Sequence, residues 1–177
     1  MTLFEQEDLG LEFPPLELVS QGVAIMNPVT SEKKIFDVSY WQGLPYVESP
    51  DDSGIDYDKL ADASEACGIR SSVDELRDLR LDQNYEELND RGVPLWFYHY
   101  FFPDGDVREQ AQYFDSLVAG KNLTYHQFKA VLDVERIVQG MSQIEYADKV
   151  RQFFYYSVFA DCIYTQDSVG SGDWSLW

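Results

Sequence analysis

Short apolar segments alternate with amphipathic stretches from Lys33 onward, and this alternation limits the folds open to the chain more than any other feature. Apolar segments of this length, rich in β-branched and aromatic residues, predict strands. They cover residues 35–40, 67–71, 93–101, 130–135 and 161–165. Strands that alternate with helices are typical of an α/β fold with a parallel sheet or barrel.

Helices are predicted between those strands, where apolar residues recur at helical spacing. They cover residues 56–63, 76–90, 107–119 and 144–160. The first begins at Asp56, a residue type that caps helix N-termini, and the second stops before Gly92, a usual helix end. Four helices therefore alternate with five strands in the predicted order of elements.

Residues 1–32 lack this alternation and contain three prolines but no lysine or arginine. Such a segment predicts an acidic N-terminal arm or linker, followed by one domain over residues 33–177. Apolar residues in the arm, Leu11 and Phe13 among them, leave open that it docks on a partner.

The chain is strongly acidic, with 13 Lys and Arg against 32 Asp and Glu and a formal net charge of −19. It would repel phosphate backbones and anionic surfaces, so we expect no nucleic-acid partner. No apolar run reaches the length of a membrane-spanning helix, so we expect no membrane partner either. The first residues lack the basic and apolar regions of a signal peptide, so another route would have to bring the protein to an extracellular target.

The cysteines and histidines give little indication of a catalytic or metal-binding role. Cys67 and Cys162 are too few for a disulfide framework, and neither has a histidine or second cysteine at metal-ligand spacing. Their apolar neighbours predict buried free thiols, and we expect no metal site. His99 lies within a predicted strand and is expected to be a hydrogen-bonded core residue, whereas His126 lies in a polar segment and is expected at the surface.

Three acidic residues interrupt apolar strands: Asp37, Asp133 and Glu135. A buried carboxylate is costly unless it is paired, hydrogen-bonded or neutral, so a chain rarely accepts one for packing alone. Side chains two positions apart in a strand project to the same side, which places Asp133 and Glu135 together. Barrel strands carry active sites at their C-terminal ends, and glycoside hydrolysis requires converging carboxylates. Solvated strand ends would give the same pattern, so both interpretations stay open at this point.

Eight short motifs follow one another between residues 35 and 166 of the chain. They are Phe36–Gly43, Ile55–Tyr57, Ile69–Ser72, the predicted helix from Asp78 to Gly92, Tyr98–Phe101, Gln110–Phe114, Leu132–Glu135 and Ile163–Thr165. In this order and spacing they resemble the domains of glycoside hydrolase family 25.

The resemblance implies a flattened, TIM-like (β/α) barrel and an N-acetylmuramidase, which cleaves the β-1,4 bond between N-acetylmuramic acid and N-acetylglucosamine in a peptidoglycan glycan strand. Glu135 matches the family's proposed general acid. Asp133 matches the carboxylate that supports the substrate's N-acetyl group or the developing positive charge, and Asp37 matches the first-strand Asp of the cleft. No metal or organic cofactor is implied. The reaction could pass through the substrate's own acetamido group or through direct attack of water.

Aromatic residues near the matched carboxylates are candidates for binding the glycan strand. The resemblance places Tyr98 and Tyr100 on the walls of the cleft. Tyr40 and Trp41 in the first motif are further candidates, and Trp41 could equally pack inside the barrel. We expect apolar walls and neighbouring carboxylates to raise the pKa of Glu135.

A complete domain of this family would continue beyond a fifth strand, whereas the chain ends at Trp177, soon after the last motif. We therefore expect a barrel that is incomplete at its C-terminal end. The chain would be a piece of a longer or split product, or another chain would close its sheet, or the fold would be reduced and repurposed. Three interpretations stay open. They are a muramidase of phage or other origin that acts on the cell wall, a non-catalytic module with the muramidase fold in an assembly such as a virion, and an unrelated α/β protein.

Overall fold

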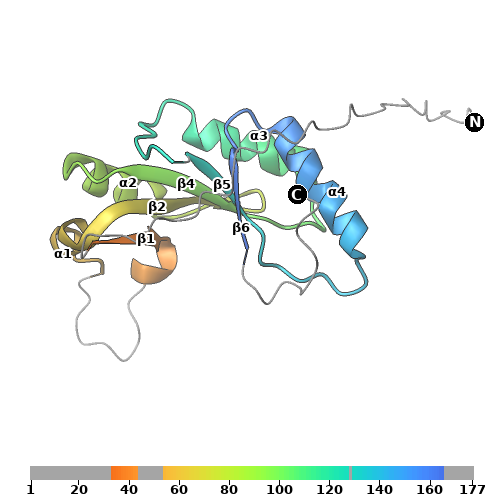
Figure 1. The fold of residues 1–177 in the computed structure, drawn as a ribbon, viewed down its shortest axis with the longest axis horizontal. Coiled ribbons are helices and arrows are strands. Elements are labelled where there is room, and N and C mark those ends of the chain that lie inside the picture. Colours follow the sequence, from red (N-terminus) through yellow and green to blue (C-terminus); the bar gives the residue numbers. More distant parts are fainter. Residues whose placement is uncertain (1–32, 44–53, 128, 166–177) are drawn as a thin grey trace, which may run out of the picture. The chain divides into compact units, whose positions relative to one another are not determined.

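The computed structural model describes residues 33–43, 54–127 and 129–165, which form a mixed α/β fold on a mostly parallel sheet (Figure 1). Within these residues, the parallel strands lie in the order β1-β2-β4-β5-β6, and the short β3 (Leu76–Arg77) runs antiparallel to the end of β2. The parallel strands are β1 Lys34–Val38, β2 Ser64–Val73, β4 Leu95–Tyr100, β5 Ala130–Asp133 and β6 Cys162–Tyr164.

The helices that connect these strands begin where side chains cap them. Asp56, Asp106 and Ser142 each accept a hydrogen bond from a backbone N–H in the first turn of α1, α3 and α4. In the described part of the chain the helical elements are the 3-10 helix η1 (Tyr40–Gly43), α1 (Tyr57–Ala63), α2 (Leu81–Asp90), α3 (Val107–Val118) and α4 (Gln143–Tyr156).

Two predicted helices are wrong at one end. The helix predicted over 76–90 begins only at Leu81, because the residues before it turn back on β2 and form β3. The Asp78 backbone N–H there donates to the Ser71 carbonyl at 2.9 Å. The helix predicted over 144–160 ends at Tyr156, because Ser157 has an extended backbone and its hydroxyl donates to Asp115 at 2.6 Å.

The two faces of the sheet pack differently. Alternate residues of β2, β4 and β5 form the main core with the helices, and this core includes Ile69, Phe97, Leu132, Leu88, Phe114 and Phe153. The opposite face carries a smaller apolar cluster around Trp96 and Tyr125. Strand register places further, polar residues on that opposite face, which we call the carboxylate face. They are Asp37, Arg70, Tyr98, Tyr100 and Asp133.

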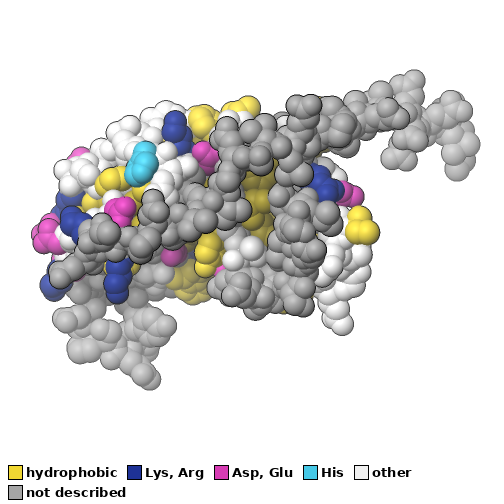
Figure 2. All heavy atoms as spheres, viewed as in Figure 1, with side chains coloured by type: hydrophobic (Ala, Val, Ile, Leu, Met, Phe, Trp, Pro, Cys, Tyr) yellow, Lys and Arg dark blue, Asp and Glu magenta, His cyan; other side chains and the backbone are white. Residues whose placement is uncertain are grey.

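Among the described residues, the path of parallel strands ends at β1 on one side and at β6 on the other. Figure 2 shows basic and acidic side chains interspersed on the described surface, with hydrophobic side chains reaching it between them. No described helix has both the length and the apolar character needed to cross a membrane. The arm predicted over residues 1–32 lies outside the described residues.

Candidate active site

The three predicted carboxylates lie at the C-terminal ends of two strands. Asp37 is the last residue but one of β1, and Asp133 is the last residue of β5. The strand predicted over 130–135 ends there, so Glu135 lies two residues beyond it. Val134 is buried in the main core, and its backbone N–H donates to the Tyr164 carbonyl at 2.8 Å. The chain therefore stays beside β6 as it passes the end of β5.

Asp133 is the most strongly perturbed of these acids. Its side chain lies on the carboxylate face and the residue is 7% exposed. Burial, followed by the negative charges of Glu135 and Asp37, raises the pKa of Asp133 to about 8, against the opposing positive charge of Arg70. The Oδ1 atom is buried and has no hydrogen-bond partner among the described residues. The site therefore favours a neutral carboxyl at pH 7, with one oxygen that can accept a hydrogen bond from a ligand.

Asp37 is held differently. The prediction that Asp37 lies in a buried strand is wrong: Asp37 is exposed, because β1 is the end strand of the described sheet path. Its Oδ2 accepts a hydrogen bond of 3.3 Å from the Tyr98 hydroxyl. Burial raises the pKa of Tyr98, and the charge of Asp37 adds to the rise, so the phenol stays a donor.

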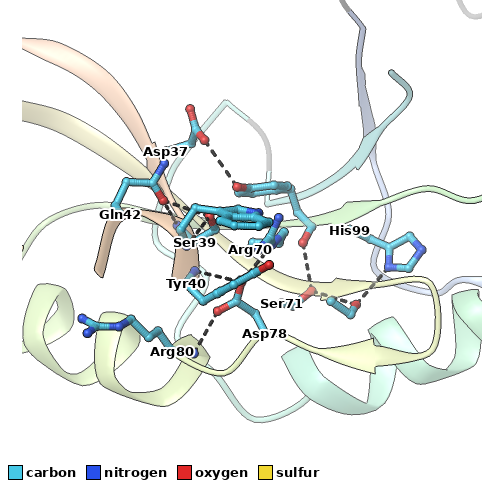
Figure 3. Close-up of polar contacts among 12 residues, drawn as sticks. Asp37, Ser39, Tyr40, Gln42, Arg70, Ser71, Asp78, Arg80 and His99 are labelled. Atoms are coloured by element: carbon cyan, nitrogen blue, oxygen red, sulfur yellow. Dashed lines mark hydrogen bonds and ion pairs between the residues drawn. The ribbon is translucent and has the colours of Figure 1, made fainter. Parts of the chain in front are cut away.

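A buried ion pair that was not predicted from the sequence lies beside these acids. Arg70 Nε donates to Asp78 Oδ2 at 2.8 Å, and both side chains are buried (Figure 3). Asp78 also accepts hydrogen bonds from the backbone N–H groups of Tyr40, at 3.1 Å, and Arg80, at 2.9 Å. The sequence signal that could have revealed this ion pair is an arginine inside an apolar strand, followed eight residues later by an aspartate.

The first turn after β1 presents two of the predicted aromatic residues. Gln42 Oε1 accepts hydrogen bonds from the Ser39 backbone N–H at 2.7 Å and from the Ser39 hydroxyl at 2.9 Å, which fixes η1 (Figure 3). The rings of Tyr40 and Trp41 lie 4.4 Å apart between centroids. Trp41 is 57% exposed, which contradicts packing inside the fold and leaves its ring available to a ligand.

The other two predicted aromatic residues lie next to the acids on β4. Tyr98 is buried, so it presents little surface to a ligand and contacts the site through Asp37. Tyr100 is half-buried, and burial followed by the charges of Asp133 and Glu135 raises its pKa. Tyr100 is therefore the tyrosine of this strand with the more accessible ring.

The histidine predictions are confirmed. His99 is fully buried on the helix side of the sheet, with Nδ1 2.9 Å from the Ser72 hydroxyl and Nε2 3.1 Å from Gln110 Oε1. Burial lowers the pKa of His99 to about 4, so the ring is neutral at pH 7. A serine next to a histidine can be a nucleophile and its base, but this pair lies inside the main core. His126 is exposed.

The cysteines are free thiols, as predicted, although only Cys67 is fully buried and Cys162 is partly exposed. Burial raises the pKa of Cys67 to about 12, which keeps this thiol protonated and unreactive. Within the described ranges, no group of three or more His, Cys, Asp or Glu side chains is arranged to hold a metal ion. The carboxylates are therefore the groups in this part of the chain best suited to acid–base chemistry.

Comparisons with solved structures agree with this fold. The chain is similar to the bacterial lysozyme from Streptomyces coelicolor, with 26% identity and a TM-score of 0.61 over 79% of this chain and 65% of that one. The catalytic domain of endolysin ply40 from bacteriophage P40 of Listeria monocytogenes gives 20% identity and a TM-score of 0.57, over 79% of this chain and 66% of that one. GHIP, a glycosyl hydrolase 25 of Streptococcus pneumoniae, gives 21% identity and a TM-score of 0.58, over 80% of this chain and 65% of that one. At such identities the last two show the fold alone.

No curated protein matches the chain. The chain spans 65% and 66% of the length of the first two structures named above. Residues 36–170 match the family described as Glycosyl hydrolases family 25, which is most of the chain. The resemblance drawn from the eight motifs is thus confirmed, and the chain belongs to glycosyl hydrolase family 25.

Proposed function

We propose that the chain acts as a peptidoglycan hydrolase, an N-acetylmuramidase that cleaves the β-1,4 bond between N-acetylmuramic acid and N-acetylglucosamine. The observation that carries the proposal is the carboxyl group of Asp133. It is buried at the end of β5, beside two further acids, with an Oδ1 atom that has no partner among the described residues. A glycosidase needs carboxyl groups that lie close together in surroundings that give them different protonation states.

The roles follow from the chemistry of the bond. Glu135 would donate a proton to the oxygen that leaves with the departing sugar. Asp133 Oδ1 would accept the N–H of the substrate's acetamido group, which orients that group near the reacting carbon. Asp37, oriented by the Tyr98 hydroxyl, would stabilise the positive charge that develops on the sugar ring. No step in this scheme uses a metal or an organic cofactor.

The glycan strand is the proposed partner, and aromatic residues would bind its sugar rings. Trp41 is exposed and Tyr40 and Tyr100 are half-buried, so each can present part of a ring face to a sugar. Among similar structures, the modular autolysin LytC from Streptococcus pneumoniae was solved in complex with a synthetic peptidoglycan ligand. The similarity to a phage endolysin fits an origin in a phage, with action on the bacterial wall.

The parallel sheet would form part of a flattened (β/α) barrel. Two observations support this finer description of the fold. Ile163 and Tyr164 of β6 are 36% and 51% exposed at the end of the described strand path. The chain also spans only 65% of the Streptomyces coelicolor lysozyme, whose fold it shares. Further strands, from whichever chain supplies them, would cover β6.

The proposal is tested by measuring the clearing of purified cell walls together with the reducing ends that appear. A muramidase releases new reducing ends on N-acetylmuramic acid. Glu135→Gln should lower the rate by about 10²–10⁴-fold, because the amide cannot donate the proton. Glu86→Gln is the matched control, since Glu86 is exposed on α2, away from the carboxylate face, and should leave the rate unchanged.

The opposite result would favour the non-catalytic module. If the folded wild-type chain binds cell walls but produces no reducing ends, the hydrolase proposal fails. If both variants keep the wild-type rate, the reaction does not depend on Glu135, and the proposed acid is wrong.

A further inference from the structure

Arg70 brings a buried positive charge to the carboxylate face. It lies on β2, where it pairs in register with Tyr98 of β4, and it is 7% exposed. Asp37 pairs with Gly68, two residues earlier on the same strand, so Arg70 lies one step beyond Asp37 on the same face. Arg70 thus occupies a central strand, between the strand that carries Asp37 and the strands that carry the other acids.

The guanidinium group is fixed by two other segments of the chain. Its Nε donates to Asp78 Oδ2 at 2.8 Å, and its central carbon lies 4.9 Å from the centroid of the Tyr40 ring. Asp78 is itself held by two backbone N–H groups, those of Tyr40 and Arg80. Because every member of this network is restrained by another, the positive charge cannot move away from the acids.

The charges around this group come from all the neighbouring elements. In addition to its ion pair with Asp78, Arg70 opposes the burial and repulsion that raise the pKa of Asp133, and it likewise opposes the rise at Tyr98. Among the described residues, the titratable and charged groups around Arg70 and Asp133 are Asp37, Tyr40, Asp78, Tyr98, Tyr100, Glu135, Arg136, Tyr146 and Tyr164.

We infer that Arg70, held by Asp78, is a positioning residue of the acidic cluster, whose fixed charge limits how many protons Asp133 and its neighbouring carboxylates hold together. The catalytic meaning of this role rests on the proposed function. Without the positive charge, Asp133 would release its proton only at a higher pH. The cluster would then carry less of the negative charge that a glycosidase needs.

The test is a carboxyl-carbon NMR titration of Asp133 in the full chain, with ¹³C-labelled aspartate. Arg70→Gln should move the Asp133 midpoint upward by about one pH unit, because the compensating charge is lost. Arg70→Lys keeps the charge and should restore most of the wild-type midpoint. Arg108→Gln, which removes an exposed arginine from α3, should leave the midpoint unchanged.

Arg70→Gln leaves Asp78 buried without its cation, which can prevent folding. The double variant Arg70→Gln/Asp78→Asn removes both charges together, and it should still move the Asp133 midpoint upward, by less than Arg70→Gln, because the negative charge of Asp78 is lost as well. An unchanged midpoint in the folded double variant would overturn the inference.

Hydrolysis supplies a separate readout. The pH range in which the walls are hydrolysed should shift to higher pH in Arg70→Gln and shift back in Arg70→Lys. A purely structural role of Arg70 would instead lower the rate at all pH values. If wild-type protein shows no hydrolysis and the midpoint still depends on Arg70, the proposed function fails while the inference about the charge stands.

Discussion

Tyr98 of β4 donates its hydroxyl hydrogen bond to Asp37 of β1, and the 3.3 Å contact crosses the strand that lies between them, β2. The residue of β2 that pairs with Asp37 is Gly68, and the ring of Trp96 fills the space that a side chain at residue 68 would take. This contact therefore joins the first strand of the sheet to its centre, at the level where the carboxylates gather.

Tyr98→Phe should lower kcat/KM on cell walls about fivefold, because a single hydrogen bond to a carboxylate that supports the reaction is lost. The ring, which lies 5.8 Å from that of Trp96, should stay packed, so the thermal midpoint should change little. Tyr113→Phe on α3 is the matched control. Equal activity losses in the two variants would show that the Asp37 contact is irrelevant to the reaction.

Gly68→Ala should destabilise the fold by about 1–3 kcal/mol through overpacking. A Cβ atom at residue 68 would lie 2.3 Å from Trp96 Cζ2, far inside contact distance, and a buried indole ring has little room to move. Urea unfolding measures the loss. In a Trp96→Leu background the same substitution should cost much less, and a loss that is independent of residue 96 would contradict the steric explanation.

The order of elements could be predicted from the sequence because hydrophobic period and capping residues are local signals. Asp56 caps α1 as expected, and the apolar strand around Phe97 lies in the core. The start of α2 could not be predicted, since Leu76 lies near helical spacing but pairs with β2 through a turn whose bonds are visible only in three dimensions.

The candidate carboxylates can be identified from the sequence, whereas the residues and solvent that surround them cannot. A carboxylate inside an apolar segment is conspicuous, so the position of Asp133 in such a segment is enough to identify it. The exposure of Asp37 depends on its strand lying at the end of the sheet path, and the pairing of Arg70 with Asp78 depends on the turn between β2 and α2. Strand order and ion pairs of this kind are tertiary properties, which local periodicity does not encode.

Asp133→Asn should stabilise the protein at high pH. In the unfolded chain Asp133 ionises near 3.8, whereas in the fold it holds its proton up to about pH 8. The folded state therefore binds more protons between these values, and stability falls as pH rises from 4 to 8. Asparagine cannot ionise, so the variant escapes this loss.

The thermal midpoint of Asp133→Asn should match that of wild type near pH 4 and exceed it by about 5 °C at pH 8. Asp90→Asn, an exposed change on α2, should follow wild type at both pH values. A difference between Asp133→Asn and wild type that is the same at pH 4 and pH 8 would mean that Asp133 does not titrate in this window.

His99 should make the fold sensitive to mild acid. In the unfolded chain the imidazole gains a proton near pH 6.5, whereas burial delays this to about pH 4 in the fold. Between these values the unfolded state binds more protons, so the free energy of unfolding decreases as pH falls. The full decrease corresponds to about 3 kcal/mol. It is complete at about pH 4 and absent above pH 7.

Urea unfolding of His99→Gln between pH 7 and pH 4 isolates this effect. The variant should lose less stability than wild type across that range, by about 3 kcal/mol, whatever constant penalty it carries from its altered bonds to Ser72 and Gln110. His126→Gln removes the exposed histidine and should keep the wild-type slope. Parallel slopes for His99→Gln and wild type would show that the buried imidazole does not control acid stability, and would direct attention to the carboxylates that titrate in the same range.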